Sequence, residues 1–182
     1  MDLEQLRREV RAGATFDYLF FWGHRQKRKG GADASCLSQW FPASFVINGT
    51  IYPTAEHWMM AGKARLFGDN DMLQKILAAD EPGKAKAFGR RVRNYEDEAW
   101  AEARYGLVVE GNVEKFSQNA SLRTFLCNTG KRVLVEASPK DDIWGIGLAA
   151  SDADASDPLK WRGTNLLGFA LMEARERILS AT

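Results

Sequence analysis

Cysteine and histidine are scarce in this chain of 182 residues. The two cysteines, Cys36 and Cys127, are too few for a disulfide framework, and their scarcity fits a reducing cytoplasm. The two histidines, His24 and His57, and the distant cysteines show no spacing typical of a zinc site. We therefore predict no metal site. The Gly-Ile-Gly stretch at 145–147 is too short for a dinucleotide fingerprint, and neither a phosphate-binding loop nor a nucleophile elbow occurs, so we predict no cofactor.

The N-terminal segment lacks the apolar run of a signal peptide or a membrane span. Residues 1–10 carry acidic and basic side chains, so we predict a cytoplasmic protein with no membrane partner. An excess of charge of one sign is lacking as well, because 25 Lys and Arg against 24 Asp and Glu leave a formal net charge of +1. A nucleic acid would therefore have to be recognised by a local patch.

Length and composition predict one compact domain over residues 1–182. Hydrophobic residues make up 45% and charged residues 27% of the chain, which excludes the disordered and fibrous classes. We find no internal repeat and no linker. The predicted elements are mainly helices around a few short strands without βαβ repetition, which indicates the α+β class. The sequence carries no signal of the oligomeric state.

Hydrophobic spacing predicts the first elements of this domain. Leu3, Leu6 and Val10 recur at helical spacing, which predicts a peripheral N-terminal helix within residues 1–15. The aromatic run at 16–22 predicts a buried strand.

A hairpin and a helix follow. An Asn-Gly pair between the apolar stretches 45–47 and 51–52 predicts the hairpin, because this pair tolerates the positive φ of a tight turn. The Thr54 hydroxyl can cap a helix over 55–66. Further predicted elements are helices at 69–79, 83–91 and 122–127, a strand at 132–136, a strand or glycine-shaped wall at 143–147, an acidic surface loop at 151–160 and a final helix from Asn165 or Leu166 to about Ile178.

Residues 96–118 predict the central helix. Val109 and Phe116 belong to one apolar stripe, and Trp100 and Leu107 belong to another. At about 100° per residue, Trp100 lies roughly opposite Val109. We therefore expect this helix to be apolar on two sides and to run through the interior.

Glu56 and Lys63 are seven residues apart on the helix predicted over 55–66. They lie about 20° apart around its axis, so both can face one cleft. On periodicity alone, the commoner interpretation is that Glu56 favours the positive end of the helix dipole and Lys63 is solvated. The apolar neighbours at 58–61 favour a buried helix whose ionisable residues line a cavity.

Other polar and aromatic residues have a structural interpretation beside the functional one. His57 points about 100° away from Glu56, so it fits a core or supporting histidine better than a base. A tryptophan on an inner helix, such as Trp100, is more often a packing residue than a stacking platform. Asn165 alone would be interpreted as a helix N-cap.

Six short motifs follow one another between about Phe16 and Ile178. They are Leu37-Ser38-Gln39-Trp40-Phe41-Pro42, Tyr52-Pro53-Thr54-Ala55-Glu56-His57-Trp58, Gly62-Lys63-Ala64, Lys115-Phe116, Asp141-Asp142-Ile143-Trp144-Gly145-Ile146-Gly147 and Gly163-Thr164-Asn165-Leu166-Leu167-Gly168. In this order they resemble the successive motifs of the NADAR family, which includes the YbiA-like N-glycosidases. The resemblance implies a mainly helical α+β domain around a small sheet, and it reverses the structural interpretation of Glu56 and Lys63.

The resemblance also implies an activity and a set of site residues. The activity is cleavage of the C–N bond between ribose and an exocyclic amine, either in ADP-ribosylated guanine of nucleic acid or in ribosylamine phosphate intermediates of riboflavin synthesis. The implied catalytic residues are Glu56, Lys63 and Asp141; the implied substrate-binding residues are Trp22, Ser38, Trp58, Trp100, Trp144, Gly145 and Asn165. The chain departs from the family pattern at Gln39, where Asn is usual, and at Trp40, where Phe is commoner.

A mechanism follows as a hypothesis. A desolvated Lys63 has a lowered pKa and can attack the anomeric carbon as a neutral amine, forming a Schiff base and displacing the base. Glu56 would move protons, and Asp141 would orient a ribose hydroxyl or water. The alternative uses Glu56 and Asp141 as paired carboxylates around an oxocarbenium-like transition state.

Two further functions stay open. One is a non-catalytic module that binds ADP-ribose or a nucleotide. The other adds a nucleic-acid clamp at the basic segment 25–29, which would hold phosphates of ADP-ribosylated DNA or RNA while the cavity takes the sugar.

Overall fold

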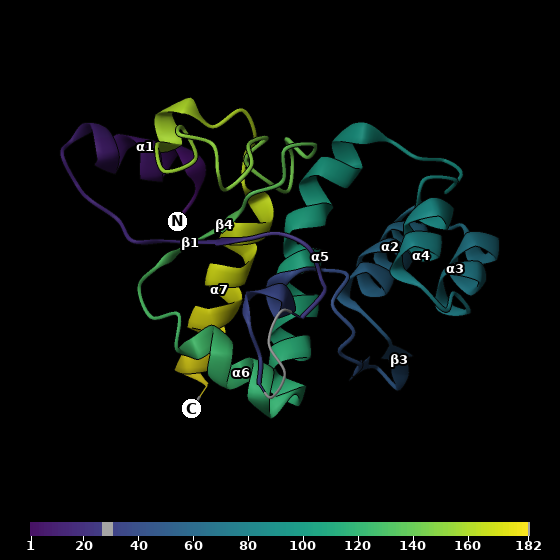
Figure 1. Ribbon diagram of the computed structural model, residues 1–182. Helices are drawn as coiled ribbons and strands as arrows, with labels where there is room; N and C mark the ends of the chain where they lie inside the picture. Colours follow the sequence, from purple (N-terminus) through teal and green to yellow (C-terminus); the bar gives the residue numbers. More distant parts are fainter. Residues whose placement is uncertain (27–30, 182) are drawn as a thin grey trace.

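The computed structural model describes residues 1–26 and 31–181 (Figure 1). Most of the basic segment predicted as a nucleic-acid clamp, residues 27–29, therefore lies outside the described residues. Within the described chain the fold is mainly helical with short strands, which confirms the predicted α+β class. The helices and strands are α1 (Leu3–Arg11), β1 (Tyr18–Phe21), β2 (Phe45–Ile47), β3 (Thr50–Tyr52), α2 (Ala55–Leu66), α3 (Asn70–Leu77), α4 (Pro82–Gly89), α5 (Asp97–Gln118), α6 (Ala120–Cys127), β4 (Val133–Glu136) and α7 (Leu166–Ser180), with short 3-10 helices η1 (Ala34–Leu37) and η2 (Pro158–Lys160).

Two small strand pairs make up the sheet structure of the described residues. β1 and β4, which are distant in sequence, pair in parallel with Tyr18 opposite Val133. β2 and β3 form the predicted hairpin, and its turn residues Asn48 and Gly49 have φ values of 50° and 75°. Residues 143–147 form a series of bends without strand pairing, so the strand alternative for this stretch is wrong.

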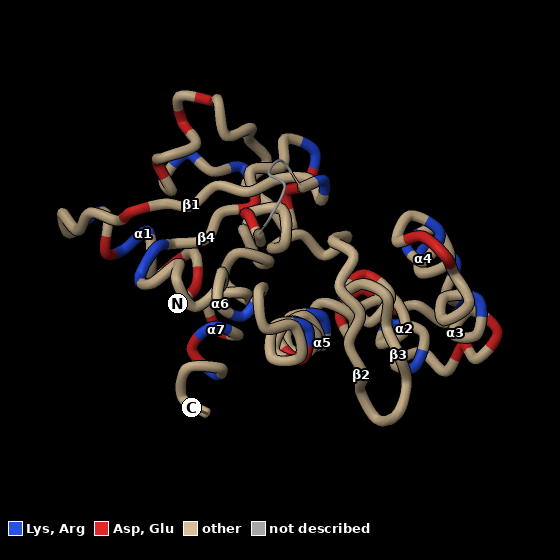
Figure 2. The backbone as a smooth tube through the Cα atoms, turned by 60° about the horizontal axis from the view of Figure 1, so that its bottom comes forward, with Lys and Arg blue, Asp and Glu red and all other residues tan. Residues whose placement is uncertain are grey.

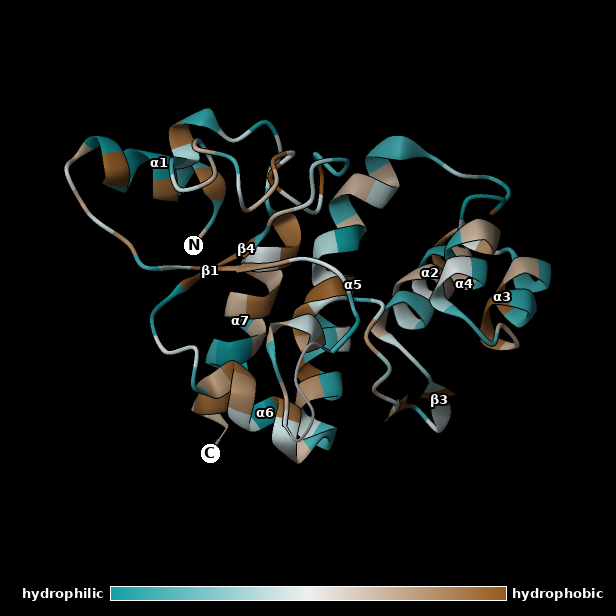
Figure 3. Cartoon of the chain, viewed as in Figure 1, coloured by the Kyte–Doolittle hydropathy of each residue, from teal (hydrophilic) through white to brown (hydrophobic). Residues whose placement is uncertain are grey.

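The long helix α5 lies between two groups of elements (Figure 1). α2, α3 and α4 gather on one side of it, and β1, β4 and α7 lie on the other. Trp100 and Val109 are both buried, which fits a helix that packs on two sides. β1 and β4 are coloured as hydrophobic in Figure 3; β4 packs against α7, and its apolar residues form a second part of the core together with Phe21 of β1.

The N-terminal helix α1 lies at the edge of the molecule and is anchored there (Figure 1). Leu6 is buried, and the Arg7 guanidinium donates hydrogen bonds to the carbonyl oxygens of Pro158 (3.0 Å) and Trp161 (3.2 Å). These bonds join α1 to the acidic segment around η2. No helix within residues 1–26 and 31–181 combines the length and apolar character needed to cross a bilayer.

The junction of β4 and α7 is unusually close. Asn165 precedes α7 with a left-handed φ of 53°, and its side chain bonds the backbone of β4 at Leu134 O (2.9 Å) and Glu136 N (3.0 Å). A Cβ added to Gly168 would lie 2.0 Å from Leu134 O. Because that neighbour is backbone, it has little room to move away, so glycine is required for the helix to approach the strand.

Replacing Gly168 with alanine is expected to lower the free energy of unfolding by about 1–3 kcal/mol, because the added methyl group overpacks this junction. Urea unfolding measures the change. The matched control is Gly106→Ala on α5, where an added Cβ meets nothing within 4 Å; that change should raise the free energy of unfolding by about 0.5–1 kcal/mol through helix propensity. Equal stability of the two variants would contradict the described contact.

Candidate active site

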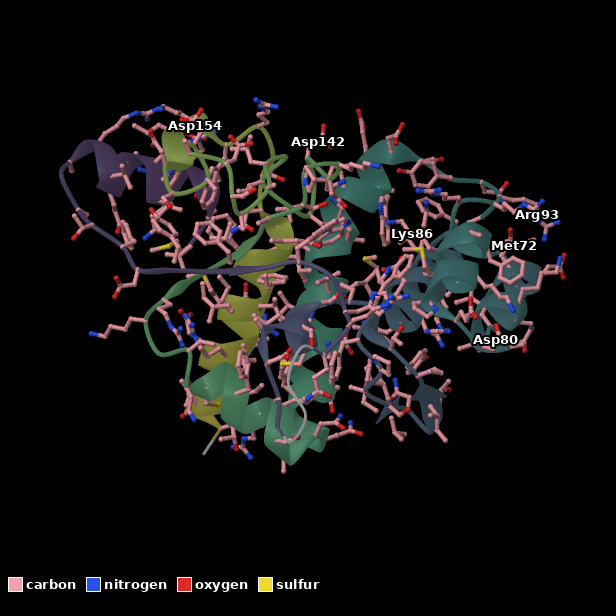
Figure 4. The ribbon with its side chains drawn as sticks, in the orientation of Figure 1. Met72, Asp80, Lys86, Arg93, Asp142 and Asp154 are labelled. Atoms are coloured by element: carbon pink, nitrogen blue, oxygen red, sulfur yellow. The ribbon has the colours of Figure 1, made fainter. Side chains whose placement is uncertain are left out.

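One cavity of about 160 Å³ brings together residues from α2, α4, α5, the end of β4 and the two segments at 38–40 and 141–144. It is lined by Ser38, Gln39, Trp40, Glu56, Met59, Met60, Lys63, Lys86, Gly89, Arg90, Trp100, Glu136, Asp141, Trp144 and Leu167. Lys86, labelled in Figure 4, comes from the part of α4 nearest α5. In Figure 2, acidic and basic residues are interspersed along the backbone.

Helix α2 places Glu56 at the cavity. The Thr54 side chain caps its N-terminus by accepting a hydrogen bond from the His57 backbone, as the sequence predicted. The backbone N–H of Glu56 donates to Gln39 O at 3.0 Å, which ties the helix to the segment at 38–40. Glu56 is only 2% exposed, so its carboxyl group has left bulk water.

Burial sets the protonation of Glu56. Desolvation and, to a smaller extent, the Asp141 carboxylate raise the pKa of Glu56 to about 7, against the opposing effects of Lys86, a hydrogen bond from the Trp40 side chain and Arg90. One of its oxygens, Oε1, is buried with no hydrogen-bond partner in the described chain. A carboxyl group in this state can both hold and release a proton near neutral pH.

Lys63 lies two turns further along α2 and lines the same cavity. Its Nζ is 3.9 Å from the ring centroid of Tyr95 and 5.5 Å from that of Trp100. Desolvation lowers the pKa of Lys63, and the nearby Asp97 carboxylate opposes this shift. A larger share of Lys63 is therefore present as the neutral amine than for a solvated lysine.

Asp141 shapes the segment that closes the cavity. Its Oδ1 accepts hydrogen bonds from the backbone N–H groups of Ile143 (3.1 Å) and Trp144 (2.7 Å), so the turn after β4 is folded around this carboxylate. Trp144 consequently lines the cavity. Gly145 does not, but a Cβ there would lie 2.8 Å from Glu136 O, so its role is to let two backbones approach.

Three further residues implied as substrate-binding do not line this cavity either. Trp22 is 63% exposed and lines a different, mainly apolar cavity of about 650 Å³. Trp58 is buried between helices, where its indole donates to Leu107 O at 2.7 Å. Asn165 is fully buried, and its amide is occupied by the β4 backbone. The side chains of Trp58 and Asn165 are engaged in packing and hydrogen bonds, and none of the three residues lines the 160 Å³ cavity.

The structure adds three charged residues that sequence reasoning missed. Glu136 ends β4, and Lys86 and Arg90 are one turn apart at the end of α4. Their signals were weak: a charged residue at the end of an apolar strand, and an i, i+4 basic pair on a helix interpreted as a surface element. Although several carboxylates line the cavity, no group of three His, Cys, Asp or Glu side chains in the described chain could hold a metal ion.

Two buried bases support the site from outside. Both ring nitrogens of His57 are engaged, with Thr54 Oγ1 at 2.8 Å and Ala79 O at 3.1 Å, in line with a core histidine. Lys115 on α5 is 0% exposed, and its Nζ donates to Cys36 O (2.7 Å) and Ser38 O (2.9 Å). Lys115 thus holds the segment that presents Ser38 and its neighbours to the cavity.

The comparisons with known proteins agree with this architecture. The family model described as the NADAR domain matches residues 20–179 of the chain. The chain belongs to the NADAR domain family. A relative from Acanthamoeba polyphaga mimivirus, N-glycosidase R617, is 45% identical over 167 residues, which cover 89% of this chain and 96% of that protein. The riboflavin biosynthesis protein VVA0006 of Vibrio vulnificus is 32% identical over 142 residues, 78% of this chain and 35% of that protein.

A solved structure has the same fold. The NMR structure of the E. coli protein YbiA superposes with a TM-score of 0.73 and 24% sequence identity, covering 92% of this chain and 88% of that one. Relatives that are 30–45% identical to this chain, over 72–89% of its length, are named N-glycosidases. This NADAR domain is therefore an enzyme of the N-glycosidase class.

The raised pKa of Glu56 makes the stability of this NADAR domain depend on pH. The folded state holds the Glu56 proton up to about pH 7, whereas the ordinary pKa is 4.5. The unfolded state therefore binds fewer protons between these values, and stability falls as the pH rises through this window.

Glu56→Gln is expected to remove the contribution of Glu56 to this fall, since the amide has no charge to desolvate. Relative to the parent chain, the variant should gain up to about 3 kcal/mol of unfolding free energy at pH 8 and little at pH 4. Urea unfolding across this range measures it, with Glu110→Gln, exposed on α5, as the control. An equal gain in unfolding free energy at both pH values would contradict the described burial of the Glu56 carboxyl group.

Proposed function

We propose that this NADAR domain hydrolyses the bond between the anomeric carbon of ribose and an exocyclic amine, with ADP-ribosylated guanine of nucleic acid as substrate. The observation that carries the proposal is the presence, in one cavity, of a carboxyl group with a pKa of about 7 on Glu56 and a lysine of lowered pKa, Lys63. The first can exchange protons at neutral pH, and the second supplies a neutral amine.

The proposed mechanism opens the sugar ring first. The ribosylamine opens to an imine, in which the exocyclic nitrogen is doubly bonded to the anomeric carbon. Lys63 Nζ adds to that carbon, Glu56 transfers a proton to the departing amine, and the base leaves while the sugar stays on Lys63 as a Schiff base. Water then releases the sugar, with Asp141 orienting that water or a ribose hydroxyl. Trp100 and Trp144 provide aromatic faces for stacking.

The size and charge of the cavity support a phosphorylated substrate. At about 160 Å³ the cavity suits the sugar, so the base and the phosphates would extend towards its mouth. Lys86 and Arg90 line the cavity and can pair with phosphate oxygens. Arg90 is exposed, so it can meet a diphosphate outside the sugar site. Arg25, at the described end of the basic segment, is proposed to contact flanking nucleic acid, and a cytoplasmic location stays a prediction.

A second substrate class is a ribosylamine phosphate intermediate of riboflavin synthesis. The similarity to the Vibrio protein named for riboflavin biosynthesis favours it, and the same two cations would hold its single phosphate. A purely binding module is disfavoured, because binding alone does not require a buried carboxyl group without a hydrogen-bond partner.

Offering both substrates to the purified protein tests the proposal. We expect the amine to be released from ADP-ribosylated guanine in an oligonucleotide faster than from the ribosylamine phosphate, as measured by chromatography of the products. Glu56→Gln should lower kcat by about 10²–10⁴-fold, because proton transfer is lost, while Glu110→Gln should keep it. Release from neither substrate would refute the proposed activity, and faster release from the second would reassign the substrate.

The Schiff base can be trapped chemically. Borohydride added during turnover should reduce the imine and leave the sugar covalently bound to the peptide that contains Lys63, as detected by mass spectrometry. Lys63→Ala should lose both the adduct and the activity. Lys75→Ala, which changes an exposed lysine of α3, is the matched control and should keep both. An active Lys63→Ala variant would remove the covalent mechanism and favour the paired carboxylates.

A further inference from the structure

A second buried carboxyl group in the cavity has no role in the mechanism described so far. Glu136 lines the cavity opposite α2, and its Oε2 is buried without a hydrogen-bond partner in the described chain, as is Oε1 of Glu56. An unsatisfied buried oxygen is unfavourable, so the pair calls for a ligand with complementary polar groups. A ribose ring with its hydroxyls is such a ligand.

The backbone around Glu136 is held on several sides. Its N–H donates to Asn165 Oδ1 (3.0 Å), and its carbonyl oxygen accepts from Ile146 N (3.0 Å). The strand pairing places it opposite Phe21 of β1, and its carbonyl oxygen lies so close to Gly145 that a Cβ there would be 2.8 Å away. Glu136 therefore presents its carboxyl group from a rigid strand end, as precise catalysis requires.

The charges facing Glu136 favour a neutral carboxylic acid. Asp141 follows on the same segment and Glu56 faces it from α2, while Lys86 from α4 is the cation that counteracts them. Lys63 and Arg90 line the cavity as well; from α7 the lining residue is Leu167. Burial, then Asp141 and Glu56, raise the pKa of Glu136 to about 8. Glu136 is therefore largely protonated at neutral pH.

We propose that Glu136 is a second catalytic acid, which gives its proton to the ring oxygen of ribose when the sugar ring opens. The inference rests on the proposed ribosylamine hydrolysis and deepens it. In this step the lone pair of the exocyclic nitrogen forms the C=N bond as the bond from the anomeric carbon to the ring oxygen breaks. The ring oxygen takes the Glu136 proton, and the nitrogen loses its proton to the Glu56 carboxylate. The reverse transfer reprotonates Glu136 when the released sugar closes its ring.

The surroundings of the two glutamates divide these tasks. Glu56 has two cations, Lys86 and Arg90, and the Trp40 hydrogen bond to stabilise its ionised form, so it can accept a proton from nitrogen. Glu136 has the single counteracting cation Lys86 and two neighbouring carboxyl groups, so it retains its proton until the ring oxygen needs it. Two carboxyl groups whose surroundings differ are a recurring basis for acid and base roles in one site.

Glu136→Gln tests the inference, since the amide keeps the shape and a donor N–H but has no proton to transfer. Turnover is measured with an oligonucleotide carrying ADP-ribosylated guanine and with a ribosylamine 5-phosphate. We expect kcat to fall about 10²–10⁴-fold with KM nearly unchanged. The parent kcat should fall above about pH 8, where Glu136 loses its proton, and this alkaline decline should be absent from the residual activity of the variant.

Controls separate the possible failures. Glu136→Asp keeps a transferable proton on a shorter side chain and should retain part of the activity together with the alkaline decline; loss of that decline overturns the inference even if Glu136→Gln does not fold. A Glu136→Gln variant with the parent kcat and pH profile also overturns the inference. If Glu56→Gln still loses activity in that case, the proposed function stands without the role of Glu136. If the parent chain releases amine from neither substrate, the proposed function itself fails.

Discussion

The bridge from Asn165 to β4 is the interaction on which the site depends. Its amide satisfies both a carbonyl and an N–H at the end of the short strand β4, at 2.9 and 3.0 Å. The left-handed backbone at Asn165 and the missing side chain of Gly168 let α7 approach closely enough for this bond. Glu136 and the turn around Asp141 continue from that strand end. Asn165, which the resemblance implied as a substrate contact, thus serves the site by holding the backbone of Glu136.

A second constraint is the near-complete burial of α2. Because Trp58, Met59, Met60 and Ala61 are all buried, the helix cannot rotate to expose Glu56 without losing core contacts. The gain from burying these apolar side chains, about 1.5–3 kcal/mol for each large one, offsets the cost of an ionisable group among them. The same packing that stabilises the domain therefore perturbs the pKa values on which the proposed chemistry relies.

Local signals predicted most elements, because each has a short-range cause. The hydroxyl of Thr54 and the apolar neighbours of Glu56 set the bounds of α2, and the Asn-Gly turn set the hairpin. The parallel pairing of β1 with β4 joins residues far apart in sequence, and no local pattern encodes it. Glu136 was missed for this reason: as part of a strand it looked like a terminal charge, and only tertiary packing places it opposite α2.

Two buried carboxyl oxygens in the cavity are energetically unfavourable, and a substrate with hydrogen-bond donors can relieve this cost. Glu56 and Glu136 each keep a buried oxygen without a partner, in a cavity that Asp141 makes more negative. A folding requirement alone would favour apolar or paired residues at these positions. Sugar hydroxyls would satisfy the two oxygens, and Lys63, held over the Tyr95 ring at 3.9 Å, lies in the same cavity. Under the proposed function, relief of this unfavourable burial on binding would favour a ligand that is rich in hydroxyl groups and carries an amine.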